Sequence, residues 1–236
     1  MIFRPSKKKI DKSIKFKLDG KRLFPTESVK YLGVLLDEHL QWNKQIKHVK
    51  TKLSRAIGIL SRLRHNANLN VLKIAYHSIF GSHLQYGSQL WAQTSRENVN
   101  AIQVLQNRAL RKIAFKKSND PVSELYKDFK ILKFCDLVQL QNCLFMVQLE
   151  QNEKLAKSFT ELKHCGENHN YKTRAATKNL LATPFCNTDT YGTHSTKYRC
   201  ITDWNNFKKS FPDLPQTDYT YIKIKTLLKK DLLSKY

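Results

Sequence analysis

The chain has 236 residues, of which 42 are Lys or Arg and 19 are Asp or Glu, so its formal net charge is +23. This excess exceeds what solubility requires and points to an anionic partner: nucleic acid, an anionic membrane surface or an acidic protein. No stretch approaches the roughly 18 apolar residues of a membrane-spanning helix, and the first residues lack the apolar core of a secretory signal, which predicts an intracellular protein of the nucleus or cytoplasm.

The first predicted elements are β-strands. Apolar and basic residues alternate over 14–18 and again over 21–24, on either side of Asp19-Gly20, which is typical of a hairpin with a tight turn. The segment Val29–Leu36 is a short apolar run rich in β-forming residues and is predicted as a third strand. Asp37 follows it as a stop signal and possible helix cap.

From about Trp42 the period changes, and apolar residues at three- and four-residue steps predict an amphipathic helix. The apolar stripe comprises Ile46, Val49, Leu53, Ile57, Leu60 and Leu63. The other face is basic, and no acidic residue lies between Glu38 and Glu97 to neutralise it. A surface helix stabilised by ion pairs would place acidic residues four positions away from its Lys and Arg. Their absence here favours anion binding. Membrane attachment is disfavoured because Leu and Ile, rather than Trp and Phe, fill the apolar face.

Further helices are predicted downstream. One begins near Asn68 to Asn70, with possible breaks at Gly81 and Gly87, and another begins after Ser95 as its cap. The stripe of the latter helix is Val99, Ile102, Leu105, Leu110 and Ile113, with Arg108, Arg111, Lys112, Lys116 and Lys117 in its last turns. One or two turns are expected over 122–126, and a largely buried helix over 136–150.

Residues 151–195 lose periodicity and are interpreted as loop-dominated. Near the end, Asp218 can cap a helix that carries Ile224, Leu227, Leu228 and Leu232. The predicted fold is therefore mainly α with a small antiparallel β element at the N-terminus, an α+β chain with a helical bundle and a loop-rich C-terminal extension.

Residues typical of catalysis are missing. Two-metal phosphoryl transfer needs clustered carboxylates, and the adjacent pair Asp37-Glu38 is better explained as a helix-start cap. There is no P-loop and no recognisable nucleophile signature, so no catalytic or metal-binding residue is predicted. Five cysteines without a Cys-x-x-Cys pair are expected to be thiols. A further alternative is a zinc-dependent module, whose ligands would be drawn from His164, Cys165, His169, Cys186, His194 and Cys200.

A family resemblance rests on the order of these pieces: a hairpin, then Val-Lys-Tyr-Leu-Gly-Val-Leu-Leu-Asp over 29–37, then Leu-Gln-Trp over 40–42 opening a basic helix. This order resembles the C-terminal part of jockey-like non-LTR (LINE-type) retrotransposon reverse transcriptases. Shorter similarities are found at 54–60, 84–91, 105–113, 171–174, 191–192 and 204–205. The Asp of an early palm strand and the Tyr/Phe-x-Asp-Asp turn of that family are absent here, and Met1-Ile2-Phe3 resembles the palm strand that follows them.

The resemblance implies an organisation. Residues 1–40 would be the end of the palm with the primer-grip strands, 41–118 the helical thumb, 119–150 a helical connector, and 151–236 a C-terminal extension that ends in a basic helix. The primer-grip candidates are Tyr31, Leu32 and Gly33, with Gly33 allowing close approach of the backbone. Phosphate-binding candidates on the basic helices are Lys44, Lys47, Lys50, Lys52, Arg55, Arg62, Arg108, Arg111 and Lys112.

The functional hypothesis is a fragment of an RNA-directed DNA polymerase that contacts template-primer phosphates and is inactive by itself. Its partners would be an RNA template, an RNA/DNA hybrid or DNA, and the upstream palm and fingers of the parent polyprotein, with no membrane and no small-molecule substrate. No cofactor is expected in this chain, whereas the intact family enzyme would use Mg²⁺. The alternative is a retained, non-catalytic host protein that binds nucleic acid.

Overall fold

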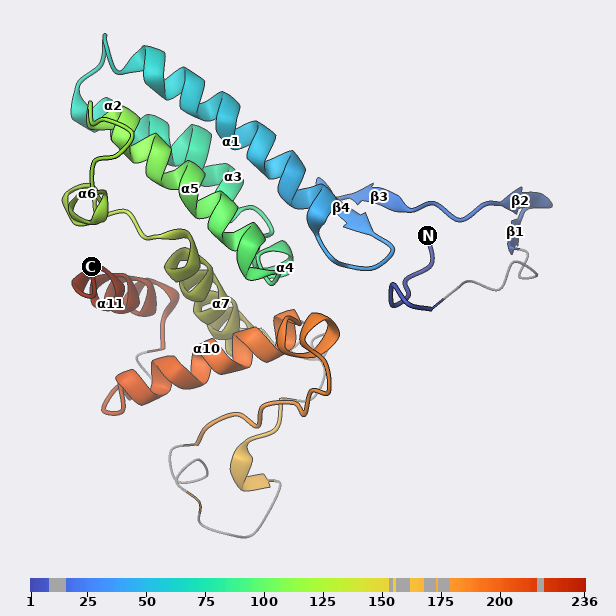
Figure 1. Cartoon of the computed structure of the whole chain (residues 1–236). Helices are drawn as coiled ribbons and strands as arrows, with labels where there is room; N and C mark the ends of the chain where they lie inside the picture. The colour runs from blue at the N-terminus through green and yellow to red at the C-terminus, as the bar shows by residue number, and fades with distance from the viewer. Residues whose placement is uncertain (9–15, 153–154, 156–161, 168–172, 174–178, 216–218) are drawn as a thin grey trace.

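The computed structural model describes all residues except 9–15, 153–154, 156–161, 168–172, 174–178 and 216–218. At the N-terminus, β1 (Phe16–Leu18) and β2 (Lys21–Leu23) pair antiparallel, with Phe16 opposite Leu23. Asp19 and Gly20 turn the chain with φ angles of 48° and 76°. The predicted hairpin is confirmed from Phe16 onward, whereas its first two residues lie outside the described part. It projects away from the helices (Figure 1).

The predicted single strand over Val29–Leu36 is wrong, because this segment folds into a second hairpin. Strands β3 (Ser28–Tyr31) and β4 (Val34–Asp37) pair antiparallel, with Tyr31 opposite Val34. Leu32 and Gly33 form the turn with φ angles of 44° and 82°, which are typical of a two-residue type I′ turn. Val34 and Asp37 are buried, so β4 is the strand that joins the hairpin to the helices.

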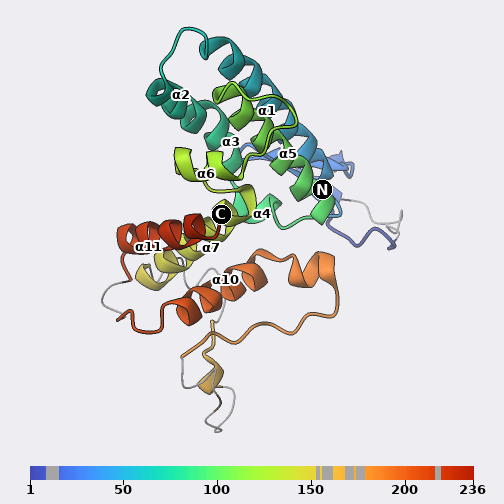
Figure 2. The same cartoon turned by 60° about the vertical axis from the view of Figure 1, so that its left-hand side comes forward.

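The amphipathic helix expected from Trp42 is α1 (Asn43–Leu63), and it buries Ile46, Val49, Leu53, Ile57 and Leu60 as predicted. It runs parallel to α5 (Arg96–Ile113), whose predicted cap Ser95 accepts a hydrogen bond from the Asn98 amide. At one end of the pair the Asn98 side chain donates to Asn43 Oδ1 over 2.9 Å, and at the other Arg64 donates to the Lys112 carbonyl over 3.1 Å. The two helices lie side by side in both views (Figures 1 and 2).

Four short helices connect α1 to α5: α2 (Leu69–Ala75), the π-helix η1 (Tyr76–Gly81), α3 (Ser82–Gln85) and α4 (Ser88–Trp91). Asn68 caps α2 by accepting from the Val71 amide, as predicted. Gly81 does not break the helical path, which continues into α3, whereas Gly87 does, with a φ of 62°. The one or two turns expected near 122–126 are α6 (Ser123–Phe129).

The predicted buried helix is α7 (Phe134–Gln151), and it lies at the junction of two hydrophobic clusters. The first cluster contains the buried faces of α1, α2, α5 and α6, together with Val138 of α7. The second contains Leu144 and Val147 of α7 and the inner faces of α10 (Thr196–Ser210) and α11 (Tyr221–Ser234). The predicted mainly α fold with a small N-terminal β element is thus confirmed.

The C-terminal extension is more helical than the sequence predicted, because α10 was not expected. Between 162 and 195 the regular structure of the described residues consists of η2 (Cys165–Glu167), η3 (Asp189–Thr193) and one bridge between His164 and Leu181. Helix α11 is capped by Thr220, which accepts from the Lys223 amide, while the predicted cap Asp218 lies outside the described residues. None of the described helices combines the length and apolarity needed to cross a bilayer.

Candidate nucleic-acid interface

A basic groove lies where the tip of the β3–β4 hairpin meets α1 and α3. Its lining residues are Lys30, Leu32, Gly33, Gln45, His48, Val49, Lys52, Ser82, His83 and Tyr86, and we call it the hairpin groove. Two Lys and two His line it, with no Asp or Glu among the lining residues. The groove therefore brings two of the three primer-grip candidates, Leu32 and Gly33, next to the phosphate-binding candidate Lys52.

Tyr86 fixes the hairpin tip against the helices. Its hydroxyl donates a 2.5 Å hydrogen bond to the Leu32 carbonyl, and its ring lies 3.3 Å from where a Cβ on Gly33 would stand. From the other side, Gln45 of α1 accepts a hydrogen bond from the Leu35 amide over 3.0 Å. Gly33 thus adopts a positive φ and also lets another group approach its backbone closely. That group is the Tyr86 ring of this chain.

The predicted primer-grip residues do not form a strand. Tyr31 is the last residue of β3, whereas Leu32 and Gly33 are the turn. Tyr31 and Leu32 are 64% and 74% exposed, so their side chains project into solvent at the tip instead of packing in the core. An exposed aromatic and aliphatic pair beside a basic groove is suited to contact a base or sugar next to bound phosphates.

The side chains of the groove repel one another electrostatically. Burial lowers the pKa of His48, and the positive charges of Lys52, Lys30 and nearby cations lower it further. Burial and Lys52 also lower the pKa of His83. Both imidazoles are thus held in the neutral form near pH 7, and a bound anion would relieve the repulsion between the remaining cations.

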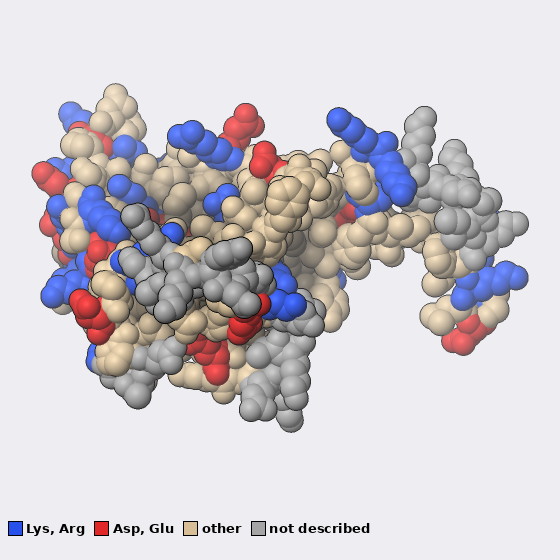
Figure 3. Space-filling view, turned by 90° about the horizontal axis from the view of Figure 1, so that it is seen from below, with Lys and Arg blue, Asp and Glu red and all other residues tan. Residues whose placement is uncertain are grey.

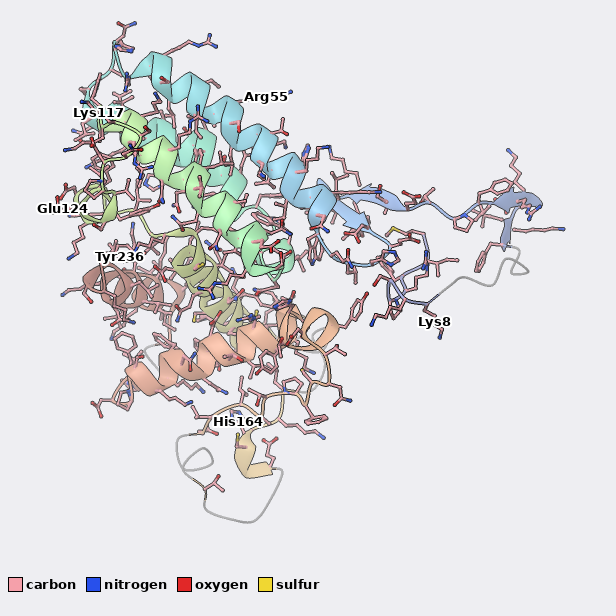
Figure 4. All side chains as sticks on the ribbon, in the orientation of Figure 1. Lys8, Arg55, Lys117, Glu124, His164 and Tyr236 are labelled. Atoms are coloured by element: carbon pink, nitrogen blue, oxygen red, sulfur yellow. The ribbon has the colours of Figure 1, made fainter. Side chains whose placement is uncertain are left out.

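Among the α1 candidates, Lys47, Lys50, Arg55 and Arg62 are exposed and form no ion pair within the described part of the chain. Arg55 projects from the outer face of α1 (Figure 4). Lys44, Arg55 and Arg62 follow one another at intervals of eleven and seven residues, which returns them to one stripe of a 3.6-residue helix. Lys44 differs from the other α1 cations because its charge is paired. Its ammonium group lies 3.5 Å from the Glu27 carboxylate and donates a hydrogen bond to the Ser28 hydroxyl at 3.2 Å.

The α5 candidates do not line the hairpin groove. Arg108 is exposed on α5, but Arg111 donates through Nε to the Asp120 carbonyl over 2.8 Å and holds the following loop. Lys112 is half-buried beside the C-terminal end of α1, where its carbonyl accepts from Arg64. The structure therefore separates these residues from Lys52 and the hairpin tip.

The adjacent carboxylates Asp37 and Glu38 do not fit a Mg²⁺ site. Asp37 accepts hydrogen bonds from the amides of His39, Gln41 and Trp42 at 3.1, 3.1 and 2.9 Å, and so organises the loop that leads into α1. Glu38 pairs with Arg4 at 3.2 Å and with His39 at 3.3 Å. Both carboxylates are engaged in structural contacts, but the predicted helix-start cap is wrong, because the N-cap of α1 is Trp42 and its first turn contains no acidic residue.

The zinc alternative finds no support in the described residues, which contain no group of three or more His, Cys, Asp or Glu able to hold a metal. Cys200 is fully buried in the second hydrophobic cluster, where burial raises the pKa of its thiol to about 12. His169 lies outside the described residues. All five cysteines are free, as expected.

Sequence reasoning missed Lys30, His48, His83 and Tyr86 as members of the groove. His48 lies one helical turn before Lys52, so helix periodicity places it on the same side of α1. The other three come from β3 and from α3 and its end, and only the fold brings them together. Tyr86 was noticed within a short family-like segment, without a role.

Comparisons with known proteins support a retroelement relationship. The chain is 27% identical over 126 residues to the RNA-directed DNA polymerase from mobile element jockey of Drosophila melanogaster, covering 52% of this chain and 14% of that protein. It is 27% identical over 129 residues to the probable RNA-directed DNA polymerase from transposon X-element of the same species, covering 53% and 14%. It is 33% identical over 102 residues to the probable RNA-directed DNA polymerase from transposon BS, again of Drosophila melanogaster, covering 41% and 11%.

No protein-family model matches the chain, and no solved structure matches it. The similarity confirms the resemblance to jockey-like retrotransposon reverse transcriptases over about half of the chain. The aligned segment is only 11–14% of the length of these relatives.

Proposed function

We propose, on the premise that the chain is related to reverse transcriptases of jockey-like retrotransposons, that it is the segment of such an enzyme that holds template and primer. In this proposal the hairpin tip contacts the primer strand, and the exposed cations of α1 follow its phosphates. The observation that carries the proposal is the convergence of the tip, Lys30 and Lys52 in one groove without a lining carboxylate. Tyr86 and Gln45 support it by holding the tip in a fixed position.

Contacts of this kind are made to the sugar-phosphate backbone, so binding should tolerate any base sequence and depend strongly on salt. An RNA/DNA hybrid would be recognised by its shape. Catalysis would belong to the parts of the parent enzyme that hold Mg²⁺, because Asp37 and Glu38 are engaged in structural contacts here. The purified chain is accordingly expected to bind a primer-template without extending it, and primer extension by the chain alone would contradict the proposal.

The decisive test is the salt dependence of binding to an RNA/DNA hybrid, measured by fluorescence anisotropy. Replacing Lys47, Lys50 and Arg55 by Ala should reduce the slope of log K against log salt by roughly 0.7 to 0.9 for each lost contact. The matched control replaces Lys17, Lys21 and Lys209 by Ala, which removes three exposed charges outside the groove. Equal slopes in both variants would mean that the α1 face is only a solvated surface.

A further inference from the structure

A second basic site lies on the C-terminal extension, far along the chain from the hairpin groove. Two adjoining hollows meet between α11, the end of α6 and η1, and both are lined by Lys130, Tyr221, Lys225 and Lys229. One hollow continues to His77, Gly81 and Gln85, and the other to Lys127 and Lys230. We call this combined site the lysine cleft. No Asp or Glu lines either hollow.

The charges in the lysine cleft are close enough to disturb one another. Burial lowers the pKa of Lys229, and the charges of Lys225 and Lys130 lower it further. His77 responds in the same way, since burial and then Lys229 lower its pKa. None of the three lysines forms an ion pair within the described residues, and Asp231 of the same helix is paired with Lys235 at 2.6 Å. A cluster of like charges without a counter-ion favours an anionic ligand.

The lining of the cleft also contains an aromatic ring and an aliphatic side chain. Tyr221 is 37% exposed, and Lys225 Nζ lies 6.0 Å from the centre of its ring, while Ile222 beside it is 77% exposed. Lysines that alternate with an exposed aromatic ring and an aliphatic side chain provide phosphate contacts and a stacking surface at the same site. This combination fits single-stranded nucleic acid better than a duplex, whose bases are stacked inside.

The two basic sites are connected along one helical path. Ser82 and His83 line the hairpin groove, whereas His77, Gly81 and Gln85 of the same η1–α3 segment line the lysine cleft. His77 and Ser82 are five residues apart, in η1 and at the start of α3 respectively. Over residues 77–82 the exposed side chains are those of His77, Ser78 and Ser82, none of which is acidic. A strand could pass from one site to the other without meeting a carboxylate on this segment.

We infer that the lysine cleft is a second nucleic-acid site, which binds a single strand continuing from the hairpin groove along η1 and α3. This inference rests on the proposed function and assigns α11, at the C-terminal end, to the same interface as the bundle. Phosphates would lie at Lys130, Lys225 and Lys229, and a base would stack on Tyr221.

The test measures binding of fluorescein-labelled oligo(dT) to the full chain carrying Lys130→Gln, Lys225→Gln and Lys229→Gln. For an oligonucleotide of about 24 residues that covers both sites, affinity should fall on the order of tenfold and the salt slope by roughly 0.7 per lost contact. The control is the variant with Lys17, Lys21 and Lys209 replaced by Gln, and circular dichroism verifies the fold of each variant.

Two further measurements separate the possible outcomes. Tyr221→Ala should weaken binding of the long oligonucleotide about fivefold, whereas Tyr221→Phe should retain it, because stacking needs the ring and not the hydroxyl. If the cleft variant matches the control while the α1 variant loses salt dependence, the inference fails and the proposed function stands. If the α1 variant also matches the control, the proposed function fails. If polyglutamate of equal charge displaces the oligonucleotide as well as oligo(dT) does, the cleft is a general polyanion surface and the inference is overturned.

Discussion

At the scale of single residues, three histidines of the two basic sites favour their neutral form in the folded chain. The pKa values of His48, His77 and His83 are all lowered, in each case first by burial and then by neighbouring charges. In the unfolded chain the pKa of each of these imidazoles is about 6.5. Between the unfolded and the lowered folded pKa, the unfolded state binds more protons than the folded state, so the stability from these groups is present above the unfolded pKa and is lost as the pH falls through the folded pKa.

We predict that replacing His48, His77 and His83 by Gln removes this loss. The midpoint of urea unfolding should fall from about pH 7.5 to about pH 5.5 more steeply in the natural chain than in the triple variant. The difference between the two proteins is the readout, because burial raises the pKa values of Glu150 and Asp203, which stabilises the fold on acidification. Parallel curves for the two proteins would show that the histidines titrate alike in both states.

Gly33 shows what the sequence can and cannot predict at this scale. Its neighbours were correctly identified as β-forming, but Leu32 in front of it is a residue that rarely adopts a positive φ, so no turn was predicted. In the folded chain the Tyr86 hydroxyl donates a hydrogen bond to the Leu32 carbonyl and so holds the turn. The two residues are 54 positions apart in sequence. A contact over that distance in sequence leaves no local pattern.

At the scale of elements, α10 begins at an N-cap serine that the pattern of apolar residues does not indicate. Ser195 accepts a hydrogen bond from the Tyr198 amide at 3.3 Å, as Ser95 does for α5. We predict that Ser195→Ala lowers the free energy of unfolding by about 1 kcal/mol and selectively weakens the hydrogen-exchange protection of α10 amides. Ser95→Ala is the matched control and should cost a similar amount while affecting α5. Unchanged exchange in α10 would contradict the role of Ser195.

Helices α1 and α5 were predicted because each buries one regular apolar stripe and leaves a polar face. Helix α10 was not, since its buried face includes Asn205 and Lys208. Asn205 is satisfied by two hydrogen bonds to the backbone of Leu181, at 2.9 and 2.8 Å. Lys208 is covered by the rings of Trp204 and Tyr219. Tertiary contacts make these polar residues internal, so a pattern of apolar residues cannot reveal the helix.

The hairpin groove was predictable only in part for a related reason. The basic face of α1 is a property of one helix and can be deduced from periodicity, which identified Lys52. The contributions of Lys30 and His83 depend on how β3 and α3 are placed against α1. The lysine cleft needed the same information, since its lysines come from the ends of α6 and from α11.

At the scale of the whole molecule, the net charge of +23 affects both folding stability and nucleic-acid binding. Added salt should raise the stability of the free protein and lower its affinity for nucleic acid. Acidic residues are present, and the face seen from below carries both signs of charge (Figure 3). The hairpin groove and the lysine cleft, however, are lined by cations without carboxylates. Folding brings these like charges together, so their repulsion opposes the compact state until salt screens it.

We predict that the free protein becomes more stable as NaCl rises from about 0.1 M to about 1 M, because the screening length falls from about 10 Å to about 3 Å. Thermal unfolding monitored by circular dichroism measures this. With a saturating oligonucleotide at 0.1 M NaCl, the midpoint should be higher than that of the free protein, since the ligand binds only the folded state. Its affinity decreases with salt, so the midpoint of the complex should fall and meet that of the free protein at high salt. A free protein whose midpoint is constant or falls over this range would mean that the clustered charges are already neutralised in the folded chain.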